Sequence, residues 1–358
     1  MSSPLLPDFD AQRICLIKPS ALGDVVQTLP LLPVLRERFP RARISWVINR
    51  GLAGLLEGHP HLDEIVPFDR HGSWGSWWQT LKRLRAGRYD LVFDLQGLLR
   101  TGVMTWTTHA SLRIGLESAR EGAHRACHLT LPDTGRFVPA HQRYWQVAEA
   151  FGLGEHQRET IVAIPDAVRA SARQRIASLR GRTLVIHPGA RWITKRWPIE
   201  KFSVVACKAM REYGFSILIL GSSAEKAVAA QLEELLCQLY PSGEVENLAG
   251  ATTLKELAAL LEAAHVVLTN DSGPMHLAAG MGTPVVGLFT CTSSVRSGPP
   301  GEMHELVTTE VSCAASYRKR CPHRGSRHMA CLEELSTDRV WQAFVRLMRK
   351  QERTGQVA

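Results

Sequence analysis

The chain has 358 residues, of which 45% are hydrophobic and 22% are charged, a composition typical of a soluble globular protein. Because one hydrophobic core rarely keeps growing beyond about 250–300 residues, this length predicts two domains. No apolar run approaches the ~20 residues that cross a bilayer. Residues 1–10 carry no basic segment before an apolar core, so we expect no secretory signal and a cytoplasmic location.

The net charge is +9, from 43 Lys and Arg against 34 Asp and Glu. Such a balance suits an anionic partner, for example nucleic acid, acidic lipid or a phosphorylated glycan. A surface charge that only keeps the protein soluble would look the same. The charge alone therefore does not separate an enzyme from a basic binding protein.

Short apolar runs alternate with helical stretches along the chain. They predict buried parallel strands at Ile14–Ile17, Ile44–Ile48, Ile65–Phe68, Leu91–Leu95, Thr183–Ile186, Ile217–Leu220, Val266–Thr269 and Val285–Phe289. The pattern lapses around residues 164–166, where a linker fits. The sequence thus predicts an α/β fold with two Rossmann-like, doubly wound domains at residues 1–165 and 166–335, followed by a terminal helix and tail at 336–358.

The turn Ser20–Asp24 follows the first strand and opens a helix. The free N–H groups at the start of a helix favour an anion, so this turn is a candidate ligand site. Asp24 suits a general base that deprotonates an acceptor hydroxyl. It also suits a helix cap whose carboxylate accepts bonds from backbone N–H groups. The residue alone leaves both interpretations open.

Two segments of the second half suit a phosphorylated ligand. In the loop at 187–198, Gly189 and Ala190 let a ligand approach the backbone closely, and Lys195 offers a charge for a phosphate. An exposed basic loop is the alternative. Glu225 follows another strand and suits two vicinal ribose hydroxyls, or simply a position near a helix N-terminus.

The segment Asn270–Leu277 opens a second helix after a strand. Backbone N–H groups at Ser272 and Gly273 suit a diphosphate, whereas Asp271 would repel that charge and is expected to bond backbone or a ligand hydroxyl. His276 lies one turn into the helix, either near a ligand or buried and satisfied. The sequence lacks G-x-G-x-x-G after a strand, G-x-x-x-x-G-K-[ST] and G-x-S-x-G, which argues against dinucleotide oxidoreductases, P-loop NTPases and α/β-hydrolases.

Five segments in order resemble glycosyltransferase family 9, the ADP-heptose:lipopolysaccharide heptosyltransferases. They are Lys18–Pro30, Asp90–Gly97, the 187–198 loop, Gly221–Glu225 and Asn270–Leu277. The resemblance implies a GT-B architecture, two Rossmann-like domains facing across a cleft, with the last helix packing back on the N-terminal domain. It also implies inverting transfer of heptose from ADP-L-glycero-β-D-manno-heptose to the Kdo/heptose inner core of lipopolysaccharide, with no metal or other cofactor.

The same resemblance implies a role for each matching residue. Asp24 would be the base, and Lys195 would neutralise the departing ADP. The implied donor-binding residues are Gly189, Ala190, Lys195, Glu225, Asp271, Ser272, Gly273 and His276. On the acceptor side, Ser20, Arg113 and Arg120 match, and an arginine fork suits Kdo carboxylates. Ordinary surface arginines are the alternative.

The expected partners are ADP-heptose, a lipid-linked Kdo/heptose acceptor and the anionic inner membrane surface, without nucleic acid. The segment Trp74–Arg88 mixes tryptophans with basic residues, which suits a bilayer surface. A solvated helix with part-buried tryptophans is the alternative. Two other functions compete: a family relative that glycosylates another glycan or a protein, and a basic non-catalytic protein that binds nucleic acid or membrane.

Eight cysteines are too few for a disulfide-dense chain of this length, so we expect reduced thiols. Cys313, Cys321 and Cys331 cluster in the sequence, but they lack the C-x-x-C spacing of strong zinc motifs. A metal site, a phosphate-binding segment and a surface loop all remain open for this stretch. Thr290-Cys291-Thr292 departs from the Gly-Pro-Thr that family members often carry there.

Overall fold

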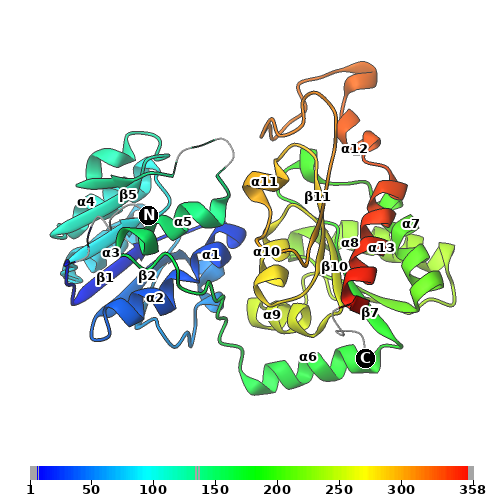
Figure 1. The fold of residues 1–358 in the computed structure, drawn as a ribbon, viewed down its shortest axis with the longest axis horizontal. Helices are drawn as coiled ribbons and strands as arrows, with labels where there is room; N and C mark the ends of the chain where they lie inside the picture. The colour runs from blue at the N-terminus through cyan, green and yellow to red at the C-terminus, as the bar shows by residue number, and fades with distance from the viewer. Residues whose placement is uncertain (1–5, 7, 134, 136–137, 354–358) are drawn as a thin grey trace. The chain divides into compact units, whose positions relative to one another are not determined.

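The computed structural model describes residues 6, 8–133, 135 and 138–353. The chain divides into two compact units, Met1–Ala163 and Ile164–Ala358 (Figure 1). Each unit contains one six-stranded sheet, and its neighbouring strands run parallel. The predicted α/β class with two doubly wound domains is confirmed. Residues 1–5 and 7, which carry much of the segment tested above for a secretory signal, lie outside the described residues.

The strands of unit 1 are β1 (Arg13–Ile17), β2 (Arg43–Asn49), β3 (Glu64–Phe68), β4 (Leu91–Asp94), β5 (Leu112–Leu116) and β6 (Leu129–Leu131). Their order in the sheet is β3-β2-β1-β4-β5-β6, the doubly wound order of the Rossmann fold. The winding reverses between β1 and β4, where Ile17 pairs with Asp94. At such a switch point the carboxyl ends of the strands leave a crevice for ligands.

Helices cover both faces of this sheet, and their bounds are α1 (Leu22–Thr28), α2 (Leu31–Arg38), α3 (Trp74–Ala86), α4 (Leu99–Thr108) and α5 (Ala140–Ala150), with short turns η1 (Arg50–Leu55) and η2 (Ala123–Ala126). Helices α1, α2 and α5 pack together, whereas α3 and α4 lie side by side over Cys15 and Ile17 (Figure 1). Pro30 is the N-cap of α2 and separates it from α1, because proline has no N–H to continue the hydrogen-bond ladder of α1.

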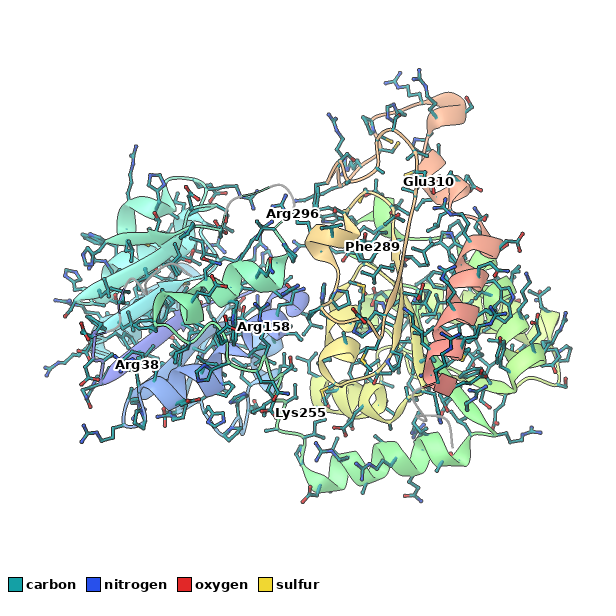
Figure 2. All side chains as sticks on the ribbon, viewed as in Figure 1. Arg38, Arg158, Lys255, Phe289, Arg296 and Glu310 are labelled. Atoms are coloured by element: carbon teal, nitrogen blue, oxygen red, sulfur yellow. The ribbon has the colours of Figure 1, made fainter. Side chains whose placement is uncertain are left out.

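The strands of unit 2 are β7 (Arg182–His187), β8 (Phe215–Ile219), β9 (Val245–Asn247), β10 (Val266–Asn270), β11 (Val285–Phe289) and β12 (Glu305–Thr308). The sheet order β12-β11-β10-β7-β8-β9 repeats the winding of unit 1. The second switch point therefore lies between β7 and β10, where Thr269 pairs with His187. Side chains fill the space between helices and sheet, and Phe289 at the end of β11 is fully buried (Figure 2).

The long helices of unit 2 are α6 (Asp166–Ser178), α7 (Ile199–Tyr213), α8 (Lys226–Leu239), α9 (Leu254–Ala263), α10 (Gly273–Gly280) and α13 (Thr337–Arg353). Shorter helical turns are η3 (Ile193–Lys195), η4 (Ser223–Glu225), α11 (Ser294–Ser297), η5 (Gly325–Arg327) and α12 (Ala330–Glu334). Helix α9 packs against α6 and α10, and α7 packs against α8 and α13. None of the described helices is both long and apolar enough to cross a membrane.

Helix α13 packs its apolar face into unit 2, and its expected contact with the N-terminal domain stays a prediction. Its rings Trp341 and Phe344 stack with centroids 5.3 Å apart, and Phe344 meets Phe215 of β8 edge-on at 5.5 Å. Leu347 and Met348 continue the same buried stripe. The apolar face of the helix is thus used against α7 and the sheet of its own unit.

Candidate active site

The carboxyl ends of β1 and β4 place a polar cluster at the switch point of unit 1. Lys18 follows β1 and is buried, and its ammonium donates to the carbonyl oxygen of Leu95 at 3.0 Å. The same ammonium lies 4.0 Å from Asp24 Oδ2 and 4.6 Å from the centroid of the Tyr144 ring. Burial lowers the pKa of Lys18, while the carboxylates of Asp24 and Asp94 act in the opposite direction.

Asp24 is the third residue of α1, and 38% of its side-chain surface is exposed. Its Oδ2 accepts a bond from the N–H of Ala21 at 3.1 Å, which is the helix-capping role. Its Oδ1 accepts a bond from the Tyr144 hydroxyl at 2.7 Å. Burial and the Asp24 carboxylate raise the pKa of Tyr144 well above its ordinary value, so the phenol stays a donor. Capping and a role as base are compatible in this geometry, because the carboxylate is oriented and still exposed.

Asp94 fixes the neighbouring loop after β4. It is buried, and its Oδ1 accepts bonds from the N–H groups of Gln96 at 3.0 Å and Gly97 at 2.9 Å. Burial raises the pKa of Asp94 to about 6, although these backbone bonds act against the rise. Gln96 in turn accepts a bond from the N–H of Ser20 at 3.3 Å. The two loops at the switch point are therefore tied together.

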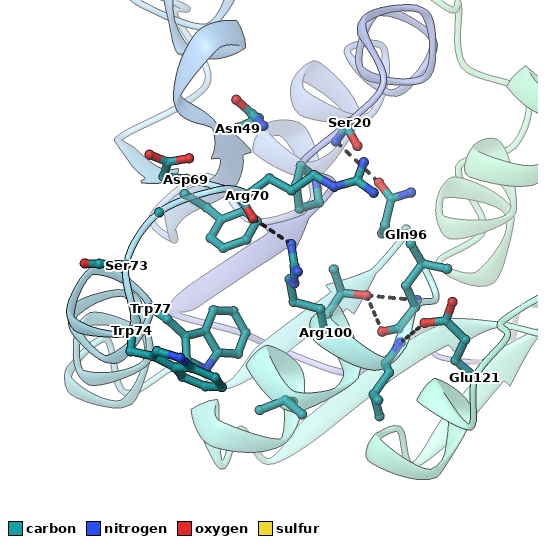
Figure 3. Close-up of a pocket in the computed structure, with 17 residues that line it drawn as sticks. Ser20, Asn49, Asp69, Arg70, Ser73, Trp74, Trp77, Gln96, Arg100 and Glu121 are labelled. Carbon is teal, nitrogen blue, oxygen red and sulfur yellow. Dashed lines mark hydrogen bonds between the residues drawn. The ribbon is translucent and has the colours of Figure 1, made fainter. Parts of the chain in front are cut away.

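A pocket of about 650 Å³ opens beside these loops at the carboxyl ends of β1 to β5 (Figure 3). Ser20 and Gln96 line one end, and Trp74 and Trp77 line the other. Figure 3 shows the side chain of Arg70 extending from the loop after β3 toward Ser20 and Gln96. The pocket combines aromatic surface with a guanidinium, a chemistry that suits an anionic sugar.

Arg100 is a second guanidinium in this pocket, and the sequence did not single out either arginine. It donates to the carbonyl oxygen of Arg70 at 3.2 Å and lies 5.6 Å from the centroid of the Phe68 ring. Glu121 lines the same pocket, but its carboxylate accepts a bond from the N–H of Leu99 at the start of α4. The sequence could have indicated these pocket residues only by their position, since each of them follows the carboxyl end of a predicted or observed strand.

The structure separates the two arginines that were expected on the acceptor side. Arg113 donates to the carbonyl oxygens of Ala126 at 2.7 Å and Ala110 at 3.0 Å, at the amino end of β5. These bonds engage its guanidinium in the fold, away from the pocket. Arg120 lies in the loop after β5, at the carboxyl edge, where its N–H donates to Gly97 O at 2.8 Å. Its side chain is exposed, and its acceptor role stays a prediction.

The carboxyl ends of β7 and β10 form the corresponding site of unit 2. His187 ends β7, and its Nε2 lies 3.5 Å from Glu225 Oε2 while its Nδ1 lies 3.3 Å from Ser272 Oγ. Glu225 Oε2 also accepts bonds from the N–H and the hydroxyl of Ser222, at 2.8 and 2.7 Å. Burial by itself would raise the pKa of Glu225, but His187 and Ser222 lower it to about 2. Glu225 is therefore a carboxylate that can accept further bonds.

Gly189 leaves room for this carboxylate. A Cβ on Gly189 would lie 1.8 Å from Glu225 Oε1, closer than any real contact. The glycine thus lets Glu225 approach the backbone of the loop, in addition to any approach by a ligand. The next residue, Ala190, is buried, and its carbonyl oxygen accepts a bond from Arg196 Nε at 2.7 Å.

Lys195 and Asp271 form a close ion pair in unit 2. The ammonium of Lys195 lies 2.6 Å from Asp271 Oδ2 and 4.7 Å from the centroid of the Trp192 ring. The hydroxyl of Thr292 donates to the same oxygen at 2.6 Å. Asp271 was expected to bond backbone or a ligand hydroxyl, whereas here it holds a lysine and a threonine. The sequence had drawn attention to Thr292 only because Thr290-Cys291-Thr292 differs from the Gly-Pro-Thr common in the family.

Helix α10 presents an open N-terminus at this switch point. Ser272 is its N-cap and Gly273 its first residue, and no described side chain caps the first turn. The N–H groups of that turn are therefore available to an anion. His276 is buried one turn into the helix. Asn270, which the sequence had not singled out as a site residue, donates to Pro188 O at 2.7 Å and so fastens the 187–198 loop to β10.

The cysteine-bearing segment lies beside the 187–198 loop. Arg318 O accepts a bond from the Thr194 hydroxyl at 2.8 Å, and the N–H of Tyr317 donates to Cys291 O at 2.7 Å. All eight cysteines are free thiols. Within the described part of the chain, no three His, Cys, Asp or Glu side chains are grouped closely enough to hold a metal ion. The metal alternative for Cys313, Cys321 and Cys331 thus has no geometric support.

Comparison with known sequences identifies the family. The model described as glycosyltransferase family 9 (heptosyltransferase) matches residues 77–326. The lipopolysaccharide core heptosyltransferase OpsX of Haemophilus influenzae is 27% identical over 302 residues, which cover 83% of this chain and 84% of OpsX. Lipopolysaccharide heptosyltransferase 1 of Pseudomonas aeruginosa is 29% identical over 335 residues, covering 87% of this chain and 88% of that protein.

Solved structures show the same fold. A family 9 glycosyltransferase from Veillonella parvula aligns with a TM-score of 0.79 at 24% identity, covering 95% of this chain and 98% of that one. The E. coli heptosyltransferase WaaC with ADP-2-deoxy-2-fluoro heptose aligns with a TM-score of 0.69 at 22% identity, covering 93% and 99%. The predicted GT-B fold class is confirmed. Since the family model matches more than half of the chain, the protein belongs to glycosyltransferase family 9, the heptosyltransferases.

Proposed function

We propose that the protein is an inverting heptosyltransferase that moves heptose from ADP-L-glycero-β-D-manno-heptose to the Kdo/heptose inner core of lipopolysaccharide. The observation that carries this proposal is the presence of two different sites at equivalent switch points. Unit 1 presents an oriented, exposed carboxylate in Asp24. Unit 2 presents the cation Lys195 near the open N-terminus of α10.

The donor would bind to unit 2 through its ADP group. The N–H groups at Ser272 and Gly273 suit the diphosphate, because a helix N-terminus carries unsatisfied donors and a positive dipole end. Glu225 suits the ribose hydroxyls, because its low pKa keeps it an acceptor. The ADP-sugar analogue named with E. coli WaaC supports ADP as the nucleotide.

The chemical step is a single displacement at the anomeric carbon. Asp24 takes the proton of the acceptor hydroxyl while that oxygen forms the new bond to the heptose. The bond between the anomeric carbon and the ADP oxygen breaks at the same time, and ADP leaves with the electron pair. Lys195 offsets the charge that develops on the diphosphate. Tyr144 and Asp271 are positioning residues, since they hold Asp24 and Lys195 in place.

The acceptor would lie in the unit 1 pocket. Arg70 and Arg100 there suit the carboxylates of an acidic sugar such as Kdo. A relative that glycosylates another glycan or a protein remains the alternative. Membership of this enzyme family argues against the alternative of a basic, non-catalytic binding protein. A lipid-linked acceptor also implies that the protein works at the cytoplasmic face of the inner membrane.

The direct test is to incubate the protein with ADP-heptose and Kdo-lipid A and to measure ADP release and the glycolipid product. We expect both, together with greater thermal stabilisation by ADP than by UDP or GDP. Turnover of ADP-heptose on a different acceptor, with none on Kdo-lipid A, would overturn the assigned acceptor. Equal stabilisation by the three nucleotides would overturn the assigned donor.

A further inference from the structure

Helices α3 and α4 expose an apolar surface to solvent. On α3, Trp74 and Trp78 are 81% and 59% exposed, and they lie one turn apart. On α4, Leu99, Val103 and Trp106 are 58%, 37% and 60% exposed and share one helix face. We call these five residues the α3–α4 surface. A solvent-facing stripe of this kind is usually polar.

The two stripes form one continuous surface. Helices α3 and α4 pack side by side (Figure 1). Trp74, Leu99 and Val103 line the same 650 Å³ pocket (Figure 3). Leu99, Val103 and Trp106 line a second hollow of about 230 Å³ next to it. The surface therefore runs from the mouth of the acceptor pocket along the outer side of α4.

The core of unit 1 does not need these side chains. Leu81 and Leu84 of α3 and Met104 of α4 face inward and are buried in the hydrophobic cluster over the sheet. Trp77 also turns inward and meets Phe68 edge-on at 5.8 Å. The inward faces thus supply the packing of both helices. The apolar residues on the outward faces mark an interaction surface, since such patches on soluble proteins are usually functional.

Exposed basic side chains surround the surface at Arg70, Lys82, Arg85, Arg100 and Arg125. Lys82 and Arg85 continue the helix face of Trp78, one and two turns further along α3. The acids nearby are engaged with backbone: Glu121 accepts from the N–H of Leu99, and Asp69 accepts from the N–H of His71. Five basic side chains against two carboxylates leave the rim with net positive charge, which suits an anionic partner.

We propose that the α3–α4 surface docks the protein on an anionic phospholipid bilayer. Tryptophan suits the interface between headgroups and acyl chains, because its ring is apolar and its N–H is polar. Lysine and arginine beside it suit lipid phosphates. A protein partner would instead need a patch of acidic side chains to complement the five basic side chains of the rim. The role of the surface rests on the proposed function: a lipid-linked acceptor in that bilayer would enter the pocket whose far end is Ser20.

The test uses vesicles and two matched variants of the full chain. Trp78→Ser/Trp106→Ser removes two exposed rings that do not line the 650 Å³ pocket. Val204→Ser/Leu239→Ser removes exposed apolar side chains from α7 and α8 of unit 2 and serves as the control. Co-sedimentation is measured with phosphatidylcholine vesicles and with vesicles that also contain phosphatidylglycerol, at low and high salt. Thermal unfolding checks that both variants fold.

We expect the parent and the control to bind the anionic vesicles, with affinity that falls as salt rises. The tryptophan variant should bind about tenfold more weakly. Equal binding by the two variants, or binding by the parent that ignores lipid charge, would overturn the proposal. So would a salt-insensitive dimer of the parent that the same variant dissociates, because the surface would then join two copies of the chain.

A second readout separates this proposal from the proposed function. The tryptophan variant should lose transfer to an acceptor embedded in vesicles and retain transfer to a deacylated, soluble acceptor. Equal transfer to both acceptors by the variant would overturn the docking role. Absence of transfer to either acceptor by the parent would count against the proposed function, while vesicle binding would still decide the docking surface.

Discussion

The hydroxyl of Tyr144 donates a 2.7 Å hydrogen bond to Asp24 Oδ1 across 120 positions of the chain. Tyr144 lies on α5, which packs against α1, the helix that carries Asp24. The direction of the carboxylate is thus set by a residue outside the motifs that pointed to the site. The N–H of Ala21 and the Tyr144 hydroxyl orient the two oxygens of Asp24, and 38% of its side-chain surface stays exposed.

Asp24→Asn should abolish most turnover, because the amide keeps the shape of the side chain but cannot take a proton. We expect kcat to fall by about 10³-fold with ADP affinity within about twofold of the parent. Tyr144→Phe should lower kcat by about tenfold. The double variant should be no slower than Asp24→Asn alone, because Tyr144 acts through Asp24. ADP release and calorimetric ADP binding measure these effects, and parental turnover in Asp24→Asn would remove Asp24 from the chemistry.

Gly189→Ala should weaken nucleotide binding by displacing Glu225. The new Cβ would collide with Glu225 Oε1, so the carboxylate must move away from His187 and Ser222. We expect the Kd for ADP to rise by about tenfold, the worth of one hydrogen bond to a charged group. Gly54→Ala is the control, since nothing lies within 4 Å of a Cβ there. Equal ADP affinity in both variants would show that Glu225 does not contact the nucleotide.

Lys195→Ala should damage both stability and transfer. It leaves the buried carboxylate of Asp271 without its cation, at a cost of about 2 kcal/mol in the free energy of unfolding. It also removes the charge offered to ADP, which should lower kcat/KM by about 10²-fold. Adding Asp271→Asn should recover stability but not transfer. Recovery of both would mean that Lys195 serves only as the partner of Asp271.

The unfolding free energy should depend on pH through Asp94. Burial raises its folded-state pKa to about 6, so the folded state holds this proton more tightly than the unfolded state. The resulting stability is fully present below the ordinary carboxyl pKa and is lost as pH rises through about 6. Relative to Asp94→Asn, the parent should lose about 3 kcal/mol over this range. Denaturant unfolding at several pH values measures the difference, and a constant offset would contradict it.

Eight strands could be predicted from the sequence because each is a short run of mostly apolar residues. The four others lie toward the sheet margins and have weaker patterns. β9 reads Val-Glu-Asn and is only half-buried, and β6 has three residues. In β5, Arg113 interrupts the apolar run, and its bonds to Ala110 and Ala126 depend on the folded chain. Such strands are specified by their neighbours in the sheet.

The loops at the two switch points could be predicted because they follow strands and begin helices. The side-chain contacts within each site could not be predicted. Tyr144 belongs to an ordinary amphipathic helix, and Arg70 and Arg100 follow strands without any motif of their own. Thr292 reaches Asp271 only because β10 and β11 are neighbours in the sheet. These contacts depend on tertiary packing, which the hydrophobic periodicity of the sequence does not predict.

Because synthesis runs from the N-terminus and α13 comes after all other described elements, unit 2 is completed later than unit 1. Unit 1 has all of its strands by Leu131 and its closing helix by Ala150, so it can fold while the remainder is still being made. Unit 2 lacks Trp341 and Phe344 until the last helix emerges. A chain halted before Thr337 would therefore present a finished first domain joined to a second one with bare apolar surface. That truncated species is the one that quality-control proteases should remove first.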